Sequence, residues 1–430
     1  MKKCIVIGGG LAGLTAAAYL ADSGFLVEVI EASPKLGGRA YSFKDNQTGS
    51  IVDNGQHIMM GCYRETLKYF KLIGADENLI YQKRLKVNFL KENFQIFTLT
   101  TLPLPYPFNL LSALLRYNVL SISERVIFLK FFLKLPFVSL KSLQNLSVYD
   151  WLVRENQNKR IRKAFWEILA VGALNSNIKK ASASSFAFIL REIFLAGSKA
   201  STIIIPRLGL SETYCQDSVR FLASKGGKVT LLESIERFNI KDNRVTGLET
   251  SKRKITDFDF VISAVPNFSL EKILPEIDFT DRLKLNYSSI ISIHLWLKDN
   301  FFKENFYGLI DSPVHWIFNH KDHITLVISD ANELAEKSKD ELFNLAVYEL
   351  EKFTKIKKEK IISYKIIKEK RATFVPSNDI ISFRPKSETK FKNLFLAGDW
   401  IDTGLPSTIE SAVKSGRIAS ESVILSAKSK

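Results

Sequence analysis

The pattern that most constrains the fold lies at the start of the chain, where an apolar run meets three spaced glycines. Cys4–Ile7 has the composition of a short buried strand, and Gly8, Gly10 and Gly13 follow it in G-x-G-x-x-G spacing. The first glycine permits a tight turn, the second lets the backbone approach a phosphate, and the third lets the next helix pack on the strand. The start of that helix offers unpaired N–H groups and a partial positive charge. The pattern therefore predicts a phosphate-binding turn between a strand and a helix.

The residues after this turn complete a dinucleotide-binding unit. An amphipathic helix is expected to run to about Ser23, where Gly24 stops it, and Leu26–Ile30 has the composition of a second strand. Glu31, 18 residues after Gly13, ends that strand, where a carboxylate accepts the hydroxyls of a ribose. Three glycines alone also occur in incidental turns. Strand, glycines, helix, strand and acid in this order favour dinucleotide binding.

Two more motifs bear on which dinucleotide is bound. Gly37-Gly38-Arg39 follows the acid, and a forked guanidinium suits a phosphate better than an ammonium group does; the alternative is an ordinary loop with a solvated Arg39. Near the other end of the chain, the apolar strand Leu394–Ala397 leads into Gly398-Asp399, ahead of a helix over 409–425. That aspartate can hold a polyol chain, and the start of the helix can stabilise the negative charge of a reduced flavin. The two ends together favour FAD over NAD.

These cofactor motifs resemble those of the flavin amine oxidase and phytoene desaturase superfamily. Within it, further stretches resemble the bacterial hydroxysqualene dehydroxylases, also called squalene-associated FAD-dependent desaturases. They follow one another along nearly the whole chain: Val52–His57, Leu102–Pro105, Ala173–Asn175, Ala181–Ala183, Ile205–Arg207, Leu210–Ser211 and Gly404–Ala412. Residues 299–370 match no pattern and add nothing to the resemblance.

The resemblance implies an α/β fold. An FAD-binding Rossmann-like domain of the glutathione-reductase type (FAD/NAD(P)-binding fold) is expected to join a discontinuous α+β substrate domain that carries a helical cap. A chain of 430 residues exceeds the usual size of one core, which also favours two domains. We assign residues 1–75, 205–266 and 385–430 to the FAD-binding domain, and 76–204 and 267–384 to the substrate-binding domain.

The resemblance also implies the cofactor contacts. In this superfamily a valine on a strand of the cofactor domain approaches the adenine through its backbone, a role carried over to Val229. The expected FAD contacts are Gly8, Gly10, Ala12, Gly13, Glu31, Gly38, Arg39, Gly55, Gln56, Val229, Gly398, Asp399, Thr408 and Ile409. His57 lies where the superfamily's chain passes the flavin ring, and it is the candidate catalytic residue. The alternative is a hydrogen-bonded structural histidine.

The same resemblance implies a reductive reaction on a long isoprenoid alcohol. Hydroxysqualene loses its allylic hydroxyl group and becomes squalene, for hopanoid or other squalene-derived biosynthesis, while reduced FAD supplies a hydride and is oxidised. An apolar pocket with aromatic faces and one proton donor would support this step. Two alternatives stay open: a phytoene (carotenoid) desaturase of the same superfamily, and a non-catalytic flavin-binding partner of a prenyl synthase complex.

The other polar residues that stand out in the sequence are expected to have mainly structural roles. Asp53 is expected to be a helix cap or a flavin-side contact, and His320 and His323 are expected to lie in a surface loop. Ordinary ion pairing on helices is expected for Glu167, Arg191 and Glu192. No Ser-His-Asp or metal-ligand spacing is present in the sequence, as expected where a flavin carries the difficult step. Periodicity predicts helices over 108–135, 159–173 and 338–353, and strands over 259–265, 289–297 and 324–328.

The cysteines and the N-terminus bear on the compartment. Cys4, Cys62 and Cys215 have neither metal-ligand nor disulfide spacing, which indicates a reduced compartment and no structural metal. Met1-Lys2-Lys3 ahead of an apolar run superficially resembles a signal peptide. Cleavage there would remove the glycine turn, so we interpret the sequence as a mature, cytoplasmic protein.

The net charge is strongly positive, with 61 basic and 45 acidic residues giving +16. No basic stripe interleaved with aromatic residues stands out, so nucleic acid is not an expected partner. Two interpretations remain. The charge attracts an anionic membrane surface, or it reflects a lysine-rich solvated surface.

Residues 93–140 favour the membrane interpretation. Asn93–Leu115 carries no charge and is long enough to span a bilayer, but Pro103, Pro105 and Pro107 interrupt any single helix. Arg125–Lys134 then places cations among aromatic residues, as in a helix lying in the membrane interface. The alternative is a helical cap packed on its own domain. We expect peripheral contact with the inner face of the cell membrane, where prenyl synthases are candidate partners.

Overall fold

The computed structural model describes residues 1–277 and 283–428, and its first elements form the predicted unit. β1 (Lys3–Ile7) pairs in parallel with β2 (Leu26–Ile30), and α1 (Leu11–Asp22) connects them. A Cβ atom on Gly13 would come within 1.9 Å of the Gly8 carbonyl oxygen. Only glycine therefore lets α1 lie this close to the turn.

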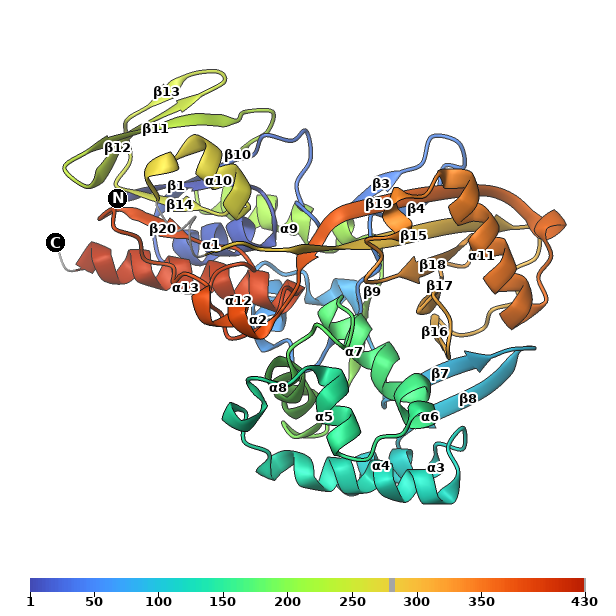
Figure 1. Ribbon diagram of the computed structural model, residues 1–430. Helices are drawn as coiled ribbons and strands as arrows, with labels where there is room; N and C mark the ends of the chain where they lie inside the picture. Colours follow the sequence, from blue (N-terminus) through green and yellow to red (C-terminus); the bar gives the residue numbers. More distant parts are fainter. Residues whose placement is uncertain (278–282, 429–430) are drawn as a thin grey trace.

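Five parallel strands from distant parts of the chain form the first sheet, in the order β10-β2-β1-β14-β20 (Figure 1). Its other strands are β10 (Lys228–Thr230), β14 (Phe260–Ser263) and β20 (Leu394–Leu396). The three strands in the middle of this sheet are mostly apolar because a parallel sheet is buried on both faces; the exception inside them is Glu28 on β2, which is also buried and pairs with Arg253. The sheet therefore needs both ends of the chain.

Alternate residues of β1 point into two different cores. Cys4 and Val6 pack with α1 and α13 (Ile409–Lys428), whereas Ile5 and Ile7 pack with a layer of short strands and a helix. That second layer consists of β11 (Ile235–Lys241), β12 (Arg244–Thr250), β13 (Lys254–Ile255) and α10 (Asn267–Ile273). The sheet is thus covered on both sides, as expected for a doubly covered α/β domain.

The second sheet has seven strands in the order β19-β15-β18-β17-β16-β7-β8 and extends to the right of the first in Figure 1. All of its pairs are antiparallel except β16 with β7. One face packs on α11 (Lys339–Thr354), whose N-terminus is capped by Ser338 and Glu341. The strands are β7 (Lys86–Lys91), β8 (Gln95–Thr100), β15 (Tyr287–Leu297), β16 (Phe306–Leu309), β17 (Trp316–Asn319), β18 (Ile324–Ile328) and β19 (Ile361–Phe374).

A helical lobe covers the other face of this sheet at the bottom of Figure 1. It contains α3 (Phe108–Arg116), α4 (Ile122–Lys134), α5 (Val148–Arg154), α6 (Lys159–Ile161), α7 (Glu167–Leu174) and α8 (Ala183–Phe194). Its core is aromatic, and the ring of Phe131 packs at a tilt against Trp151 and Trp166, at centroid distances of 4.9 and 4.6 Å. Ring contacts of this kind add to the energy of area burial.

The remaining elements join the two sheets. β3 (Ser42–Lys44) and β4 (Ile51–Asp53) form a hairpin, and a small sheet has the order β5-β9-β6. The other elements are β5 (Met59–Met60), β6 (Leu79–Tyr81), β9 (Ile203–Pro206), α2 (Arg64–Leu72), α9 (Leu210–Ser224) and α12 (Asn378–Phe383). The domain boundaries expected at 75 and 205 pass through the small sheet, and the domain division stays a prediction.

The predicted elements are found with shifted ends. The strand over 324–328 is found with those ends, and the strand over 289–297 begins two residues earlier, at Tyr287. The stretch over 108–135 is two helices, because residues 117–121 turn the chain before Ser121 caps α4. The stretch over 159–173 contains a π-helical turn at Arg162–Trp166.

Candidate functional site

Glu31 lies at the carboxyl end of β2, facing the glycine turn. Its Oε2 accepts the Gly9 N–H at 2.6 Å and its Oε1 accepts the Ser33 N–H at 2.7 Å. Two backbone donors fix the carboxylate, and its remaining lone pairs stay available as acceptors. The side chain is therefore oriented before any ligand arrives.

The two glycine clusters meet face to face. The Gly37 N–H donates to the Gly9 carbonyl at 2.9 Å, and a Cβ atom on Gly38 would lie 3.1 Å from the Gly10 Cα. Gly37 and Gly38 have φ of +107° and +60°, conformations that favour glycine. At the same place α1 begins after Gly10 without a side-chain cap. The result is a backbone-lined cradle with free N–H groups, which suits an anion.

Arg39 brings the N-terminal cluster into contact with the C-terminal motif. Its guanidinium forms an ion pair with Asp399 and donates to the Ala372 carbonyl at 3.0 Å. Burial alone would raise the pKa of Asp399, but the charge of Arg39 and the hydroxyl donor of Ser407 hold it below its ordinary value. The carboxylate is therefore ionised and directed at the edge of the cradle.

The loop after β20 is held in place by a buried arginine. The guanidinium of Arg384 donates to the backbone carbonyls of Asp399, Ile401 and Leu405, and burial lowers its pKa to about 10. The sequence analysis missed this residue, because a single Arg-Pro pair gives no signal of a distant partner. The loop leads into α13, where Thr408 Oγ1 accepts the Ser411 N–H at 3.1 Å.

The segment after β4 passes the same crevice. Asn54 accepts the Tyr41 N–H at 3.1 Å and donates to the Arg39 carbonyl at 2.9 Å, which places Gly55, Gln56 and His57 beside Arg39. Burial and the charge of Arg39 lower the pKa of His57 to about 4, so its ring is neutral near pH 7. Among the residues described, the buried Gln56 Nε2 has no hydrogen-bond partner. An orphaned donor here fits a ligand with acceptor atoms.

Comparison with known proteins shows the family to which the chain belongs. The sequence model of the family described as flavin containing amine oxidoreductase matches residues 11–424. The chain belongs to that family. The flavoprotein is 30% identical to the hydroxysqualene dehydroxylase of Zymomonas mobilis over 98% of this chain and 99% of that one. It is 25% identical to a 15-cis-phytoene desaturase of an Oncidium hybrid, over 98% of this chain and 78% of that one.

The fold has a similarly complete match among solved structures. An oxidoreductase from Methanosarcina mazei superposes with a TM-score of 0.77 at 16% identity, over 97% of this chain and 100% of that one. The predicted α/β fold class, the FAD cofactor and the oxidoreductase class are confirmed, and so is the resemblance to the hydroxysqualene dehydroxylases. The flavoprotein is an FAD-dependent oxidoreductase.

Val229 of the flavoprotein lies on β10, next to the strand that carries Glu31. The Thr230 carbonyl accepts the Glu31 N–H at 2.9 Å. Because peptide groups alternate in direction along a strand, the backbone groups of Val229 point the other way, to the outer edge of the sheet. The structure thus places Val229 near Glu31 with its backbone outward.

Two further long-range contacts shape the cofactor crevice of the flavoprotein. The hydroxyl of Tyr214, on α9, donates to the Ala40 carbonyl at 2.6 Å and fixes the end of the second glycine cluster. Glu410, at the start of α13, accepts the backbone N–H groups of Glu65 and Thr66, both at 2.9 Å, and so caps α2. Sequence reasoning assigned neither role, because each joins residues that are far apart in the chain.

Asp53 of the flavoprotein is a helix cap. Its Oδ1 accepts the Leu210 N–H at 3.0 Å at the start of α9, and burial raises its pKa to about 7. The prediction for Asp53 left two roles open, and the structure shows the cap.

The surface-loop prediction for His320 and His323 is wrong for His323. Its ring is 1% exposed and stacks on His320 at 4.5 Å and on Trp296 at 5.1 Å. The turn between β17 and β18 folds its rings inward onto β15, a tertiary contact that the polar sequence around them does not reveal.

The ion-pair predictions hold for Glu167, which lies 2.8 Å from Lys163, and for Glu192, 3.7 Å from Arg64. Arg191 instead donates to the carbonyls that follow α4.

Two cavities lie near these residues. One, of about 380 Å³, adjoins Arg39 and Asp399 and is lined by the rings of Phe268, Tyr287 and Trp400. Arg39 and Asp399 therefore line this cavity as well as the crevice.

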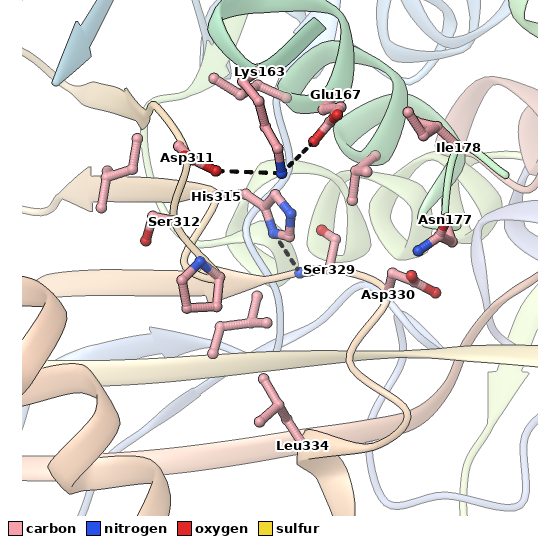
Figure 2. A pocket seen from close by; sticks show the side chains of 15 residues that line it. Lys163, Glu167, Asn177, Ile178, Asp311, Ser312, His315, Ser329, Asp330 and Leu334 are labelled. Carbon is pink, nitrogen blue, oxygen red and sulfur yellow. Dashed lines mark hydrogen bonds and ion pairs between the residues drawn. The ribbon is translucent and has the colours of Figure 1, made fainter. Parts of the chain in front are cut away.

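The other cavity, of about 230 Å³, lies between α7 and the ends of β16, β17 and β18 (Figure 2). Lys163 bridges Glu167 at 2.8 Å and Asp311 at 3.3 Å. His315 Nδ1 accepts the Ser329 N–H at 3.2 Å, which assigns the ring proton to Nε2. Its lining among the described residues includes no member of either glycine cluster, so this cavity is separate from the cofactor crevice.

Proposed function

We propose that this flavoprotein converts hydroxysqualene to squalene by reductive removal of the hydroxyl group. The observation that carries the proposal is the 30% identity to a hydroxysqualene dehydroxylase over nearly all of both chains. The crevice built from both ends of the chain supports it, since a bound flavin would carry the redox step and the protein would position it. Phytoene desaturases are less similar, so desaturation is the second candidate.

Each part of the crevice has a place in holding FAD. Glu31 would accept the ribose hydroxyls, and the backbone of Val229 would approach the adenine. The cradle of Gly8, Gly10, Ala12, Gly13 and Gly38, together with Arg39, would hold the diphosphate. Gly398 and Asp399 would hold the ribityl chain, and Gly55, Gln56, Thr408 and Ile409 would face the flavin ring. When bound and reduced, FAD supplies the hydride.

His57 is the candidate catalytic residue, as a hydrogen-bond donor to the leaving hydroxyl. In the proposed reaction the allylic C–O bond would break, and the bound, reduced cofactor would supply both the hydride for the new C–H bond and the proton with which the hydroxyl leaves as water. A neutral His57 beside the flavin segment can donate an N–H hydrogen bond to that hydroxyl. Burial and the nearby charge of Arg39 keep the ring neutral, so His57 does not add a second positive charge to the crevice.

A substrate assay tests the proposal directly. Purified protein with bound FAD is reduced anaerobically and given hydroxysqualene, and squalene is measured by mass spectrometry. Squalene formation with one equivalent of flavin oxidised is the expected result. A parallel sample receives phytoene and an electron acceptor. Desaturated product there, with no squalene in the first, would replace the proposal by the second candidate.

A non-catalytic role has its own test. If the protein only stabilises a prenyl synthase complex, a Glu31→Ala/Asp399→Ala variant would still support squalene production in cells. We expect that production to stop, because both carboxylates lie in the crevice proposed to hold the reductant.

We also propose that the flavoprotein makes peripheral contact with the inner face of the cell membrane, where prenyl synthases would be its neighbours. The charge of +16 supports this, because anionic lipids attract basic residues. No helix in residues 1–277 and 283–428 is long and apolar enough to cross a membrane.

A further inference from the structure

One helix of the lobe is apolar on two opposite sides. Phe128 and Phe131 of α4 are buried in the lobe's core. Ile122, Val126 and Leu133 follow one another at spacings of four and seven residues, which places them on one stripe of the helix, and Ile122 is 78% exposed. A surface helix of a globular protein needs only the inward stripe. The outward apolar stripe therefore indicates contact with a partner outside this chain.

The outward stripe continues onto neighbouring elements. Phe108 and Leu115, seven residues apart on α3, are also exposed, and Phe137, just after α4, is 88% exposed. We call this surface the lobe face; its members are Leu104, Tyr106, Phe108, Leu115, Ile122, Val126, Leu133 and Phe137. α3 and α4 pack together and form the lower edge of the molecule in Figure 1. A cluster of this kind marks an interaction surface.

The segment that carries the lobe face is mostly basic. Between Glu92 and Asp150 the sequence has one acidic residue, Glu124. Glu124 is only 8% exposed, and its carboxylate accepts hydrogen bonds from Ser121 and Asn158. The same interval carries five cations, of which Lys134 is paired with Glu155 at 2.9 Å. The other four are Arg116, Arg125, Lys130 and Lys141.

We propose that the lobe face docks on an anionic phospholipid bilayer. Its apolar side chains would enter the boundary between headgroups and acyl chains, while the lysines and arginines meet the lipid phosphates. The purpose of this docking rests on the proposed function, because an isoprenoid substrate is held in the bilayer. The docking itself needs no substrate and is tested without one.

The charges around the lobe face also favour a bilayer over a protein as the partner of this surface. Lysine is depleted in protein–protein interfaces, where its flexible ammonium group is costly to desolvate. At a bilayer the same groups stay hydrated at the level of the phosphates while their stems cover apolar surface. A second copy of this chain would bring the same cations against this face. Lys130 and Lys141 thus favour lipid over protein.

Vesicle co-sedimentation of the FAD-loaded protein tests the docking. We expect stronger binding to vesicles of phosphatidylcholine with phosphatidylglycerol than to phosphatidylcholine alone, and weaker binding at high salt. Ile122→Asp/Phe137→Asp should weaken binding at least about tenfold, because two apolar side chains that would enter the bilayer are replaced by charged ones. Lys130→Gln/Lys141→Gln should reduce the preference for the anionic vesicles. Tyr348→Asp, on α11 and 64% exposed, is the matched control.

Three results would overturn the inference: no binding to either vesicle, equal binding by the Ile122→Asp/Phe137→Asp variant, or a dimer in light scattering that this variant dissociates. Circular dichroism and the flavin absorbance spectrum establish that each variant is folded. Activity on detergent-dispersed hydroxysqualene is measured separately. A variant that loses vesicle binding but keeps this activity separates docking from the proposed function.

Discussion

Arg39 and Asp399 form a partly buried ion pair although 360 positions separate them in the chain. Asp399 is almost fully buried, whereas the Arg39 side chain keeps about a third of its surface exposed toward the crevice. The pair joins the second glycine cluster to the loop before α13. The proposed diphosphate and ribityl sites therefore share one electrostatic element.

Asp399→Asn should weaken FAD binding at least about tenfold, or about 1.4 kcal/mol. The amide keeps the shape but removes the charge that pairs with Arg39, and it accepts the Ser407 hydroxyl less strongly. Titration of the apoprotein with FAD, followed by flavin fluorescence, gives the affinity. Asp257→Asn, at an almost fully exposed carboxylate, serves as the control. Unchanged affinity in the Asp399 variant would remove this residue from the site.

Gly13→Ala should abolish the cofactor turn. The added methyl group would lie 1.9 Å from the Gly8 carbonyl oxygen, so α1 must move away from β1. Overpacking of this kind costs about 1–3 kcal/mol or more, and we expect a lower melting temperature with little bound flavin. Gly172→Ala is the matched helical control, because its nearest neighbour, at 3.3 Å, is the Trp316 side chain. Normal flavin content in Gly13→Ala would contradict the close packing.

Arg384→Met should loosen the loop that carries Asp399. The backbone carbonyls of Asp399, Ile401 and Leu405 would lose their buried donor, at a cost of about 1–3 kcal/mol for each group left unsatisfied. Urea unfolding should show the lost stability. Arg237→Met, at an exposed position on β11, controls for loss of a charge. If the two variants unfold at the same urea concentration, the loop is held by other contacts.

Stability should fall as the pH drops from about 7 to 5. Burial lowers the pKa of His320 to about 3 and that of His315 to about 4, below the ordinary value of 6.5. The unfolded chain then binds more protons than the folded one between pH 6.5 and these values, so their contribution is fully present above pH 6.5 and is lost on acidification. At pH 5 each histidine destabilises the folded state by on the order of 1 kcal/mol relative to pH 7. His320→Gln should flatten the pH dependence of urea unfolding, and an unchanged slope would contradict this account.

Asp53 should act in the opposite direction. Its pKa is raised to about 7, so the folded state holds a proton that the unfolded state releases near pH 4. That contribution is fully present below about pH 4 and is lost as the pH rises from there to about 7. Asp53→Asn keeps an acceptor for the Leu210 N–H and cannot ionise. We expect this variant to gain stability over the wild type at pH 8.5 but not at pH 4, as measured by thermal unfolding at both values.

The sequence alone determined the parts of the cofactor domain whose causes are local. The turn at Gly8–Gly13, the helix that follows and the acid at position 31 each depend on neighbours within one strand–helix–strand unit. Backbone sterics and hydrogen bonds act over a few residues, so their residue types and spacing are enough to predict them. The C-terminal Gly-Asp and its helix were predicted for the same reason.

Only the tertiary structure decided what brings these units together. The carbonyls held by Arg384, the capping of α2 by Glu410, the inward turn of His323 and the two-sided α4 all join residues with no regular spacing. Such contacts depend on which surfaces meet when the chain is compact, and a buried charge or an exposed apolar stripe becomes visible only then. The sequence thus determined how a flavin domain begins and ends, and packing decided how Arg39 meets Asp399 and which face the helical lobe leaves open.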